Sequence, residues 1–339
     1  MAIYKNLPVF YRPTNVLLLD DDRKLLNSLS DLIDPIFPYI LRENPAKALH
    51  YLQTHTYNTR SLSKKLFHRD YDTMSESDID EKIGFHLKTL SADLHSPEPY
   101  KRAVVALVDH MMEGMTGLKF CHHVRELGLP IQLVLLTGVA TPQEAIDALN
   151  HGIIDAYISK EELKKGDQKI NQTINNIIKM LAWKQFQHMS QALLGSVLSQ
   201  SSVLDDEHFQ EIFKKILEQQ DICEFYMTDM SCSYLLIHPS GKVKFLMVRS
   251  LSDFDTLYDV AKDSHAPHHV LQFIRDKQRY PFRRIDELLP MLEGDDWEDV
   301  MKQVDKVPGR DIFYAVLDCP NPPEIFSFNR YVNEVWPAP

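Results

Sequence analysis

The sequence predicts an α/β protein: a doubly wound, five-stranded parallel sheet, then a long linker helix, then a smaller α+β domain. In the first half of the chain, short apolar runs alternate with segments of helical periodicity, and several runs end in polar residues. Fully buried parallel strands have such sequences because helices cover both faces of their sheet. Ligands of open α/β sheets bind outside the carboxyl ends of the strands, so these polar residues are the first site candidates.

The central predicted strand covers 103–108 and is followed directly by a carboxylate, Asp109. Gly114 and Gly117 come next and suit a loop whose backbone turns tightly. Helical spacing resumes over about 117–127. Asp109 is therefore expected at a strand tip, where its side chain is available for chemistry while the core holds its backbone.

A second buried strand, 16–19, also ends in acids, because Asp20, Asp21 and Asp22 follow it. If the two strands are neighbours, Asp20, Asp21 and Asp109 meet at one edge of the sheet. Carboxylates that lie so close together are tolerable only with a cation among them. Hard oxygen ligands with room for water suit Mg²⁺, so a magnesium site is predicted at this edge.

The remaining elements of the sheet alternate between helix and strand. Before the central strand we expect a helix over 24–33, a strand over 39–41 and a helix over 45–54. After it we expect a strand over 131–136 that ends at Thr137, a helix over 142–150 with Thr141 as its N-cap, and a strand over 153–158 that ends at Ser159 and Lys160.

The polar span of about 55–99 is predicted to be an insertion. It should bulge from a surface loop, because an inserted loop adds little closure entropy. One helix is expected inside it, near 78–90, after an SxxD-type cap.

Together the residues at the strand tips provide what transfer of a phosphoryl group to a carboxylate requires. Asp109 would be the nucleophile. The developing negative charge needs Mg²⁺, held by Asp20 and Asp21, on one side and donors, Lys160 and Thr137, on the other. The alternative is that polar residues merely terminate strands. That alternative is favoured for any one of the five residues, but not for all five at these spacings.

These residues resemble the receiver domain of two-component response regulators over about 15–180. LLLDDD matches the family's acidic pair, VDHMMEGMTGLKF its phosphoacceptor strand and loop, LLTGVAT its switch threonine, and AYISK its lysine strand. The resemblance implies a CheY-like sheet of order 2-1-3-4-5 and transfer of phosphate from a sensor histidine kinase to Asp109. It also implies that the Met111 backbone carbonyl joins the metal site, that Thr137 and Tyr157 form the switch, and that phosphorylation promotes a homodimer.

The sequence departs from the family's pattern in its spacing and at two prolines. The interval from Asp21 to Asp109 is about twice the usual one, which places the insertion between the second helix and the third strand. Glu113 replaces the usual proline after the phosphoacceptor loop's methionine and adds a negative charge near the site. Glu161 replaces the proline that typically follows the lysine, and we expect this change to remove a cis peptide, since such bonds are costly without proline.

The chain from Glu161 to about Gln220 is predicted to be a helical linker. Its apolar residues share one face, which forms either a dimer seam or a contact with the chain's own domains. Heptads are not sustained, so the pattern leaves both alternatives open. The residues of this face are Ile170, Ile174, Ile177, Ile178, Leu181 and Phe186.

The last third, 221–339, predicts a small α+β output domain. Strands over 234–237 and 243–248 flank HPSG, a pattern typical of a hairpin. This part resembles a C-terminal module of some response regulators, and the whole arrangement is similar to the quorum-sensing members of the family known from Legionella. Helices are also expected near 253–262, 267–277 and 295–304, and strands over 312–317 and 325–328.

The sequence leaves the output activity open. It contains no recognition-helix pattern, P-loop or Gly-rich phosphate turn in this third. A transcription or RNA-level regulator, a nucleotide-binding or hydrolytic module and a protein scaffold are the alternatives, with nucleic acid or nucleotide as a partner in the first two. We do not expect an enzyme beyond self-phosphorylation of the receiver.

Two further clusters suggest binding sites but have simpler explanations. His265, His268 and His269 lack a Cys or carboxylate at zinc spacing, so surface or capping histidines are favoured, as for Cys121-His122-His123. A basic cluster suits a phosphate-bearing partner, but a solvated face that balances nearby acids is favoured. Its residues are Arg275, Lys277, Arg279, Arg283 and Arg284.

Composition supports a globular protein, with 44% apolar and 25% charged residues and a net charge of −11. This charge argues against broad binding to nucleic acid or anionic membrane. Four cysteines without a CxxC pair, and no long apolar span, predict a reduced, cytoplasmic, non-membrane protein. The expected boundaries are an irregular lead-in over 1–14, the receiver over 15–165, the linker over 166–220 and the output domain over 221–339.

Overall fold

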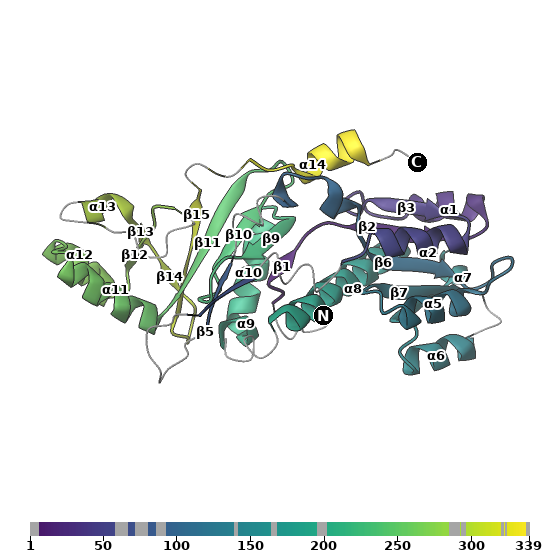
Figure 1. Ribbon diagram of the computed structural model, residues 1–339, viewed down its shortest axis with the longest axis horizontal. Coiled ribbons are helices and arrows are strands. Elements are labelled where there is room, and N and C mark those ends of the chain that lie inside the picture. Colours follow the sequence, from purple (N-terminus) through teal and green to yellow (C-terminus); the bar gives the residue numbers. More distant parts are fainter. Residues whose placement is uncertain are drawn as a thin grey trace. The chain divides into compact units, whose positions relative to one another are not determined.

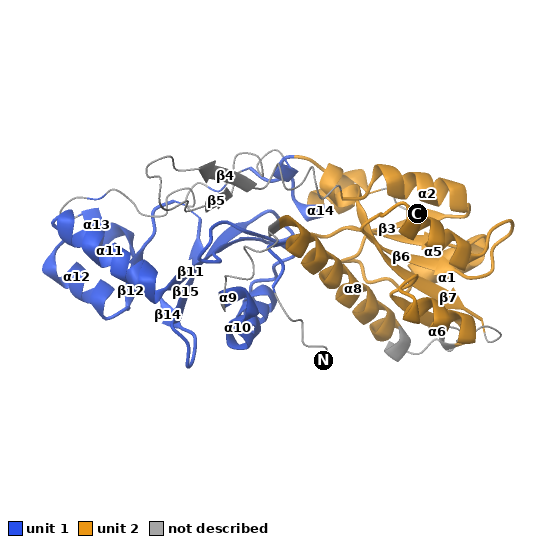
Figure 2. Cartoon of the chain, turned by 60° about the horizontal axis from the view of Figure 1, so that its bottom comes forward, with its two compact units in different colours: residues 1–11, 63–95, 194–329 blue, residues 12–62, 96–193, 330–339 orange. Residues whose placement is uncertain are grey.

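The computed structural model describes residues 7–57, 67–71, 81–85, 93–138, 142–163, 168–194, 202–284, 292, 296–319, 322 and 324–336. The chain forms two compact units, and each is assembled from several segments (Figure 1, Figure 2). Unit 1 comprises 1–11, 63–95 and 194–329, and unit 2 comprises 12–62, 96–193 and 330–339. Within the described ranges, no helix combines the length and apolar character needed to cross a membrane.

Unit 2 contains a five-stranded parallel sheet of order β3-β2-β6-β7-β8. Along the chain this order is 2-1-3-4-5, so the predicted doubly wound sheet is confirmed. Every residue of β2, β6 and β7 is buried, which explains their continuous apolar sequences. The strands are β2 (Asn15–Leu19), β3 (Tyr39–Arg42), β6 (Ala103–Asp109), β7 (Gln132–Thr137) and β8 (Ala156–Ser159).

The helices of unit 2 begin at side-chain caps that the sequence provides. Asp22 caps α1 (Arg23–Ser30), Asn44 caps α2 (Pro45–Thr54) and Thr116 caps α5 (Gly117–Glu126). Apolar residues of α2, α5 and α6 (Pro142–Asn150) pack on one face of the sheet in a single core. Residue 141, the predicted cap of α6, lies outside the described residues. After β8 the chain continues into α7 (Lys160–Leu163) and α8 (Gln168–Leu194).

Helix α8 buries the apolar face that was a candidate dimer seam. Ile174, Ile178, Leu181 and Phe186 are all buried, so of the two alternatives the structure favours packing within the chain. The Phe186 ring meets the Tyr57 ring edge to face, at 5.7 Å between centroids. Hydrogen bonds hold the same helix to unit 2, from Gln132 Nε2 to Gln185 Oε1 (2.7 Å) and from Asp34 N to Asn175 Oδ1 (2.8 Å).

The predicted linker does not remain one helix to residue 220. Asp206 follows the short helix α9 (Ser202–Asp205) and caps a separate helix, α10 (Glu207–Gln219). Its side chain accepts the Phe209 N–H, a hydrogen bond typical of an N-cap. Residues 168–193 of α8 belong to unit 2, and residues 194–220 belong to unit 1.

Unit 1 contains a six-stranded sheet of order β1-β9-β10-β11-β15-β14, with antiparallel neighbours throughout. The hairpin of β10 and β11 is confirmed. The lead-in was predicted to be irregular, but Phe10 and Tyr11 form β1 and pair with β9, a long-range contact that a two-residue run does not signal. The strands are β1 (Phe10–Tyr11), β9 (Glu224–Met227), β10 (Tyr234–Ile237), β11 (Val243–Ser250), β14 (Asp305–Lys306) and β15 (Ile312–Asp318).

One core of unit 1 lies between this sheet and the elements that follow β11. Phe245, Met247 and Phe313 of the sheet share it with Phe254, Trp297 and other apolar side chains. The predicted acidic helix ends at Val300, and β13 begins at Met301 because this residue pairs with Pro281. The elements are α11 (Leu251–Asp263), α12 (His268–Arg275), β12 (Arg279–Pro281), α13 (Asp296–Val300) and β13 (Met301–Gln303).

The insertion differs from its predicted form. A helix was expected near 78–90, but residues 81–85 form strand β5 (Glu81–Phe85), which pairs with β4 (Phe67–Tyr71) in an antiparallel hairpin. The rest of that predicted helix lies outside the described residues. A 3-10 turn at Glu98–Lys101 then leads into β6.

The carboxyl-terminal segment belongs to unit 2 rather than to the unit that precedes it. A strand was predicted over 325–328, but the chain there has no regular structure before the helical turn α14 (Phe328–Arg330) and the π-helical turn Tyr331–Val335. Tyr331 is buried, and Trp336 Nε1 donates to the Tyr39 carbonyl (2.9 Å). The units are therefore interleaved along the chain, unlike the contiguous domains expected from the sequence.

Candidate functional site

Three carboxylates meet at the carboxyl edge of the unit 2 sheet. Asp20 follows β2 and Asp109 ends β6, and the parallel register that pairs Leu19 with Val108 places the two acids side by side. Asp20 and Asp109 are buried, while Asp21 is exposed. One oxygen from each of the three lies within 4.8 Å of the others. The predicted meeting of these side chains is thus observed.

Lys160 bridges the two buried carboxylates. Its Nζ donates to Asp109 Oδ1 (2.6 Å) and to Asp20 Oδ2 (3.0 Å). Burial raises the pKa of Asp20, and the nearby Asp109 charge adds to this effect, although Lys160 and the Asp22 N–H oppose it. Burial alone would lower the pKa of Lys160, but the two carboxylates outweigh it and raise that pKa. The ammonium therefore stays charged and partly neutralises the acids.

Backbone amides hold the acidic side chains in place. The Asp22 N–H donates to Asp20 Oδ1 (2.8 Å), and the Glu113 N–H donates to Asp21 Oδ2 (2.6 Å). A proline at 113 would have no N–H to donate. The departure at Glu113 therefore adds a hydrogen bond to the acidic pair as well as a charge. Asp22 itself caps helix α1, so its carboxylate has a structural partner outside the cluster.

The predicted switch residues lie on the neighbouring strands. Thr137 ends β7 and is buried, one residue beyond Leu136, the register partner of Asp109. Tyr157 lies on β8 in register with Leu135, and it is 39% exposed. Met111 lies two residues beyond Asp109 with an exposed side chain. The Lys160–Glu161 peptide is trans, as expected.

Two contacts beside Asp109 were missed from the sequence. His110 is buried, and its Nε2 lies 3.2 Å from Glu144 Oε2 of α6. A Cβ at Gly117 would lie 2.1 Å from the Asp109 carbonyl oxygen, so glycine is needed there for a close approach rather than for its φ angle. Gly114, in contrast, has φ +78° with open space around it. The sequence predicted that both glycines lie in a tight loop, but it could not predict that Gly117 serves a close approach and Gly114 a positive φ angle.

The donor set suits a hard divalent cation. Three carboxylates that offer oxygens within 4.8 Å of one another form a typical Mg²⁺ site when waters and a carbonyl complete it. Lys160 contacts Asp109 Oδ1, and the other carboxylate oxygen, Oδ2, has no hydrogen-bond partner among the described residues. One carboxylate oxygen is thus held by the ammonium, while the other is available to a metal or to an incoming electrophile.

The other candidate clusters do not form comparable sites. His265 has φ +54° and precedes α12, whereas His269 lies on α12 and its Nε2 is 2.7 Å from Glu298 Oε1. No group of three metal-ligating side chains that includes these histidines is found in the described part of the chain. Cys121 is buried, which raises the pKa of its thiol to about 12. In the basic cluster, Arg275 and Arg279 lie over the rings of Tyr258 and Phe273.

Comparison with known proteins adds a whole-chain likeness. No family model matches the chain, and no curated protein matches it either. Among solved structures, the Legionella pneumophila response regulator LqsR is 25% identical, with a TM-score of 0.73, over 97% of this chain and 96% of that one. The receiver domain of the Francisella response regulator 1452 is 14% identical, over 50% of this chain and 98% of that one, with a TM-score of 0.32. A response regulator receiver domain from Clostridium thermocellum is 12% identical, over 51% of this chain and 96% of that one, also with a TM-score of 0.32.

The fold of unit 2 and the acids at its strand tips resemble those of one class, the two-component response regulators with an N-terminal receiver domain. The recognition of this class from LLLDDD, VDHMMEGMTGLKF, LLTGVAT and AYISK is confirmed. Along its whole length the chain resembles Legionella pneumophila LqsR.

Proposed function

We propose that this protein is the response regulator of a two-component phosphorelay, and that Asp109 accepts a phosphoryl group from a sensor histidine kinase. The observation that carries the proposal is the placement of Lys160 between Asp109 and Asp20, with Asp21 beside them at the strand tips. A structural ion pair needs one carboxylate for one ammonium. Three carboxylates with one ammonium leave a net negative site, which suits a divalent cation.

Asp20, Asp21 and Asp109, with the Met111 backbone carbonyl, are the groups that would hold Mg²⁺. Bound there, the ion would neutralise negative charge on the phosphoryl oxygens during transfer. The hydrogen bonds from the Asp22 and Glu113 amides fix the orientation of the acidic pair before any ion binds. Such fixed ligands reduce the reorganisation that binding requires.

In the proposed transfer, a free oxygen of Asp109 attacks the phosphorus atom. A P–O bond to Asp109 forms as the bond to the kinase histidine nitrogen breaks, and the electron pair leaves with the imidazole. Lys160 and Thr137 donate to oxygens of the transferred group, since both lie at strand tips next to Asp109. The Lys160 ammonium then donates a hydrogen bond to an oxygen of the phosphoryl group in place of part of its contact with Asp109 Oδ1.

The consequence we propose is a change at the surface of α6 and β8. Thr137 and Tyr157 reorient toward the phosphoryl group and alter a face on which Ile146, Leu149 and Tyr157 are exposed. Helix α6 packs against β8, so these three apolar side chains lie on adjacent elements and support a phosphorylation-dependent homodimer through this face. The output would be carried by unit 1. A cytoplasmic, quorum-sensing role is the extension that the sequence resemblance suggests.

The test is phosphoryl uptake from acetyl phosphate with Mg²⁺, followed on a phosphate-affinity gel. The Asp109→Asn variant should take up none. Asp22→Asn is the matched control, because asparagine also caps a helix and Asp22 lies outside the cluster, so it should be labelled as the parent is. Uptake by Asp109→Asn at the parental level would overturn the proposal.

A further inference from the structure

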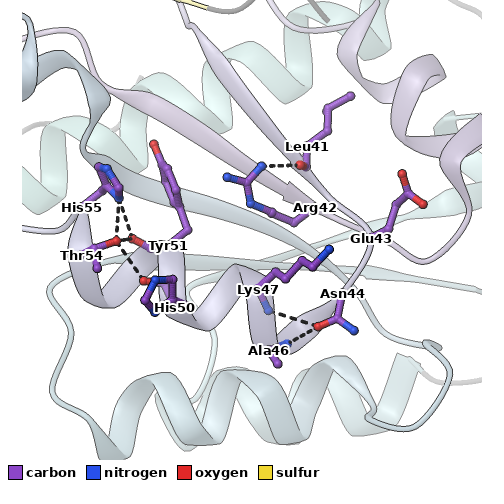
Figure 3. A pocket seen from close by; sticks show the side chains of 10 residues that line it. All are labelled: Leu41, Arg42, Glu43, Asn44, Ala46, Lys47, His50, Tyr51, Thr54 and His55. Atoms are coloured by element: carbon purple, nitrogen blue, oxygen red, sulfur yellow. Dashed lines mark hydrogen bonds between the residues drawn. The ribbon is translucent and has the colours of Figure 1, made fainter.

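A pocket of about 740 Å³ lies between the end of β3 and helix α2. It is next to the acidic site, because the Asp20 N–H donates to the carbonyl oxygen of its lining residue Arg42 (3.2 Å). It shares no lining residue with the acidic site. We call it the β3–α2 pocket (Figure 3). It is lined by Leu41, Arg42, Glu43, Asn44, Ala46, Lys47, His50, Tyr51, Thr54 and His55.

The pocket is lined by one polar face of α2 and by a strand arginine. Lys47, His50, Tyr51 and Thr54 recur at helical spacing, so they lie on the same side of the helix. Arg42 comes from β3, and its guanidinium carbon lies 5.0 Å from the centre of the Tyr51 ring. Figure 3 shows the guanidinium extending toward Tyr51 and His55 beside that ring, just after the end of α2.

The charge of this pocket is not compensated within it. Glu43 is its one carboxylate, and Arg23 Nη1 lies 3.1 Å from Glu43 Oε1. Arg42, Lys47 and His50 have no carboxylate partner among the described residues. Arg42 Nη1 donates to the Leu41 carbonyl (2.8 Å), which leaves the positive charge of the guanidinium without a counter-charge. A concave surface with such basic groups attracts anions, even in a chain with net charge −11.

The aromatic part of the pocket is fixed from the core side. The Asn15 side-chain amide donates to the Tyr51 hydroxyl (3.1 Å), and that hydroxyl donates to the Lys101 carbonyl. His55 stacks on the Tyr51 ring at 4.4 Å, and its Nδ1 lies 2.7 Å from Thr54 Oγ1. Because these side chains are already held, a ligand would meet a preorganised wall.

The first-turn amides of α2 are already occupied. Asn44 Oδ1 accepts the N–H groups of Ala46 (2.9 Å) and Lys47 (3.1 Å). An anion here would therefore be recognised by the basic side chains rather than by the helix terminus. An arginine fork together with a lysine ammonium is the donor set typical of phosphate recognition.

We propose that the β3–α2 pocket binds the phosphate group of a small phosphomonoester. Arg42 and Lys47 contact the phosphate oxygens, and His50 lies on the same helix face as Lys47. The volume exceeds what a phosphate group needs, so the organic part of the ligand lies along the same helix face toward the exposed Thr54. This site does not depend on phosphorylation of Asp109.

The test is isothermal titration calorimetry of the full chain with ribose 5-phosphate, and with ribose as the neutral control. EDTA is present, so that no divalent ion at the acidic site contributes to phosphate binding. We expect ribose 5-phosphate to bind and ribose not to bind. Arg42→Gln and Lys47→Gln should each weaken binding about tenfold, the loss of one charged hydrogen bond. Lys179→Gln, an exposed lysine of α8, should leave binding unchanged.

Three results would overturn the proposal. They are equal binding of ribose and ribose 5-phosphate, equal weakening by Lys47→Gln and Lys179→Gln, and no binding of ribose 5-phosphate, glycerol 3-phosphate or adenosine monophosphate. Arg42 packs on Tyr51, so its substitution could affect folding. Lys47 is exposed, and its variant keeps the test valid if Arg42→Gln is unstable.

Discussion

Lys160 is the residue on which the charge balance of the acidic site depends. Its ammonium is the cation that contacts Asp109 and Asp20 in the described residues, and it opposes the repulsion between them. A bound divalent ion would oppose the same repulsion, so lysine and metal share one electrostatic role. Removal of the lysine should therefore change the affinity of the site for the metal.

We predict that Lys160→Gln binds Mg²⁺ more tightly than the parent, by about tenfold or more, because one positive charge near the carboxylates is lost. Asp109→Asn should bind Mg²⁺ more weakly for the opposite reason. Calorimetric titration with MgCl₂ at mildly alkaline pH measures both effects, with Lys179→Gln as the control. Equal affinities in the parent and in Lys160→Gln would contradict this role.

The sequence could predict those site residues that are marked by a pattern in their own segment of the chain. Asp20, Asp21, Asp109, Thr137 and Lys160 each follow a recognisable apolar run, and the parallel register brings the three acids and Lys160 together. The β3–α2 pocket had no such signal. Its residues come from a strand and a helix whose relative placement is fixed only by packing, and Arg42 looks like an ordinary strand end in the sequence.

At the scale of elements, caps and hairpins were predictable, while long-range pairings were not. Helix α5 and the β10–β11 hairpin begin and end within a residue or two of their predicted bounds, because their signals are local. Strand β1 and the β4–β5 hairpin were missed. The pairing of β1 with β9 joins segments more than half the chain apart. Strands β4 and β5 are short and largely polar, so their sequences lack the alternation of apolar and polar residues that marks a strand.

Helix α10 provides a test at this scale, because its cap carries a charge. Asp206 accepts the Phe209 N–H (2.9 Å), and Arg310 Nε donates to its other oxygen. Burial opposes ionisation of Asp206, but Phe209, Arg310 and His208 outweigh it and hold the pKa below its ordinary value. A lowered pKa in the folded state means that the stabilisation is present above the unfolded-state pKa and is lost as the pH falls through the folded-state pKa.

We predict that Asp206→Ala lowers the free energy of unfolding by about 1 kcal/mol at neutral pH, as loss of an N-cap does. Asp206→Asn keeps the acceptor and loses only the charge, so its loss should be smaller. Denaturant unfolding across a pH series measures both. The difference between the parent and Asp206→Asn should shrink as the pH falls below the ordinary range of aspartate. A difference that stays constant with pH would argue against a charge effect.

At the scale of the whole molecule, the chain passes between the two units several times. The carboxyl-terminal segment closes this path, since 330–339 belongs to unit 2 after more than a hundred residues in unit 1. Tyr331 accepts a hydrogen bond from the Asn15 amide (3.1 Å), and its ring lies 5.2 Å from Tyr100. Burial raises the pKa of Tyr331 to about 12, so the hydroxyl stays protonated. The receiver is thus completed by the far end of the chain.

We predict that Tyr331→Ala destabilises unit 2 by about 3 kcal/mol, the usual loss for a large buried aromatic side chain. Tyr331→Phe should lose only about 1 kcal/mol, since the ring packing remains. Trp183 and Trp336 lie in unit 2 and Trp297 in unit 1, so fluorescence of a Trp297→Phe background reports the unfolding of unit 2. Parental stability of Tyr331→Ala in that background would show that the segment is dispensable.

The assignment of Asp109 as the phosphoacceptor is tested most directly by locating the modified residue. Borohydride reduces an aspartyl phosphate to homoserine and releases the phosphate, so peptide mass spectrometry after treatment with acetyl phosphate and Mg²⁺ identifies the acceptor. We predict homoserine at position 109 and at neither Asp20 nor Asp21. Homoserine at another position, with Asp109 intact, would contradict the account.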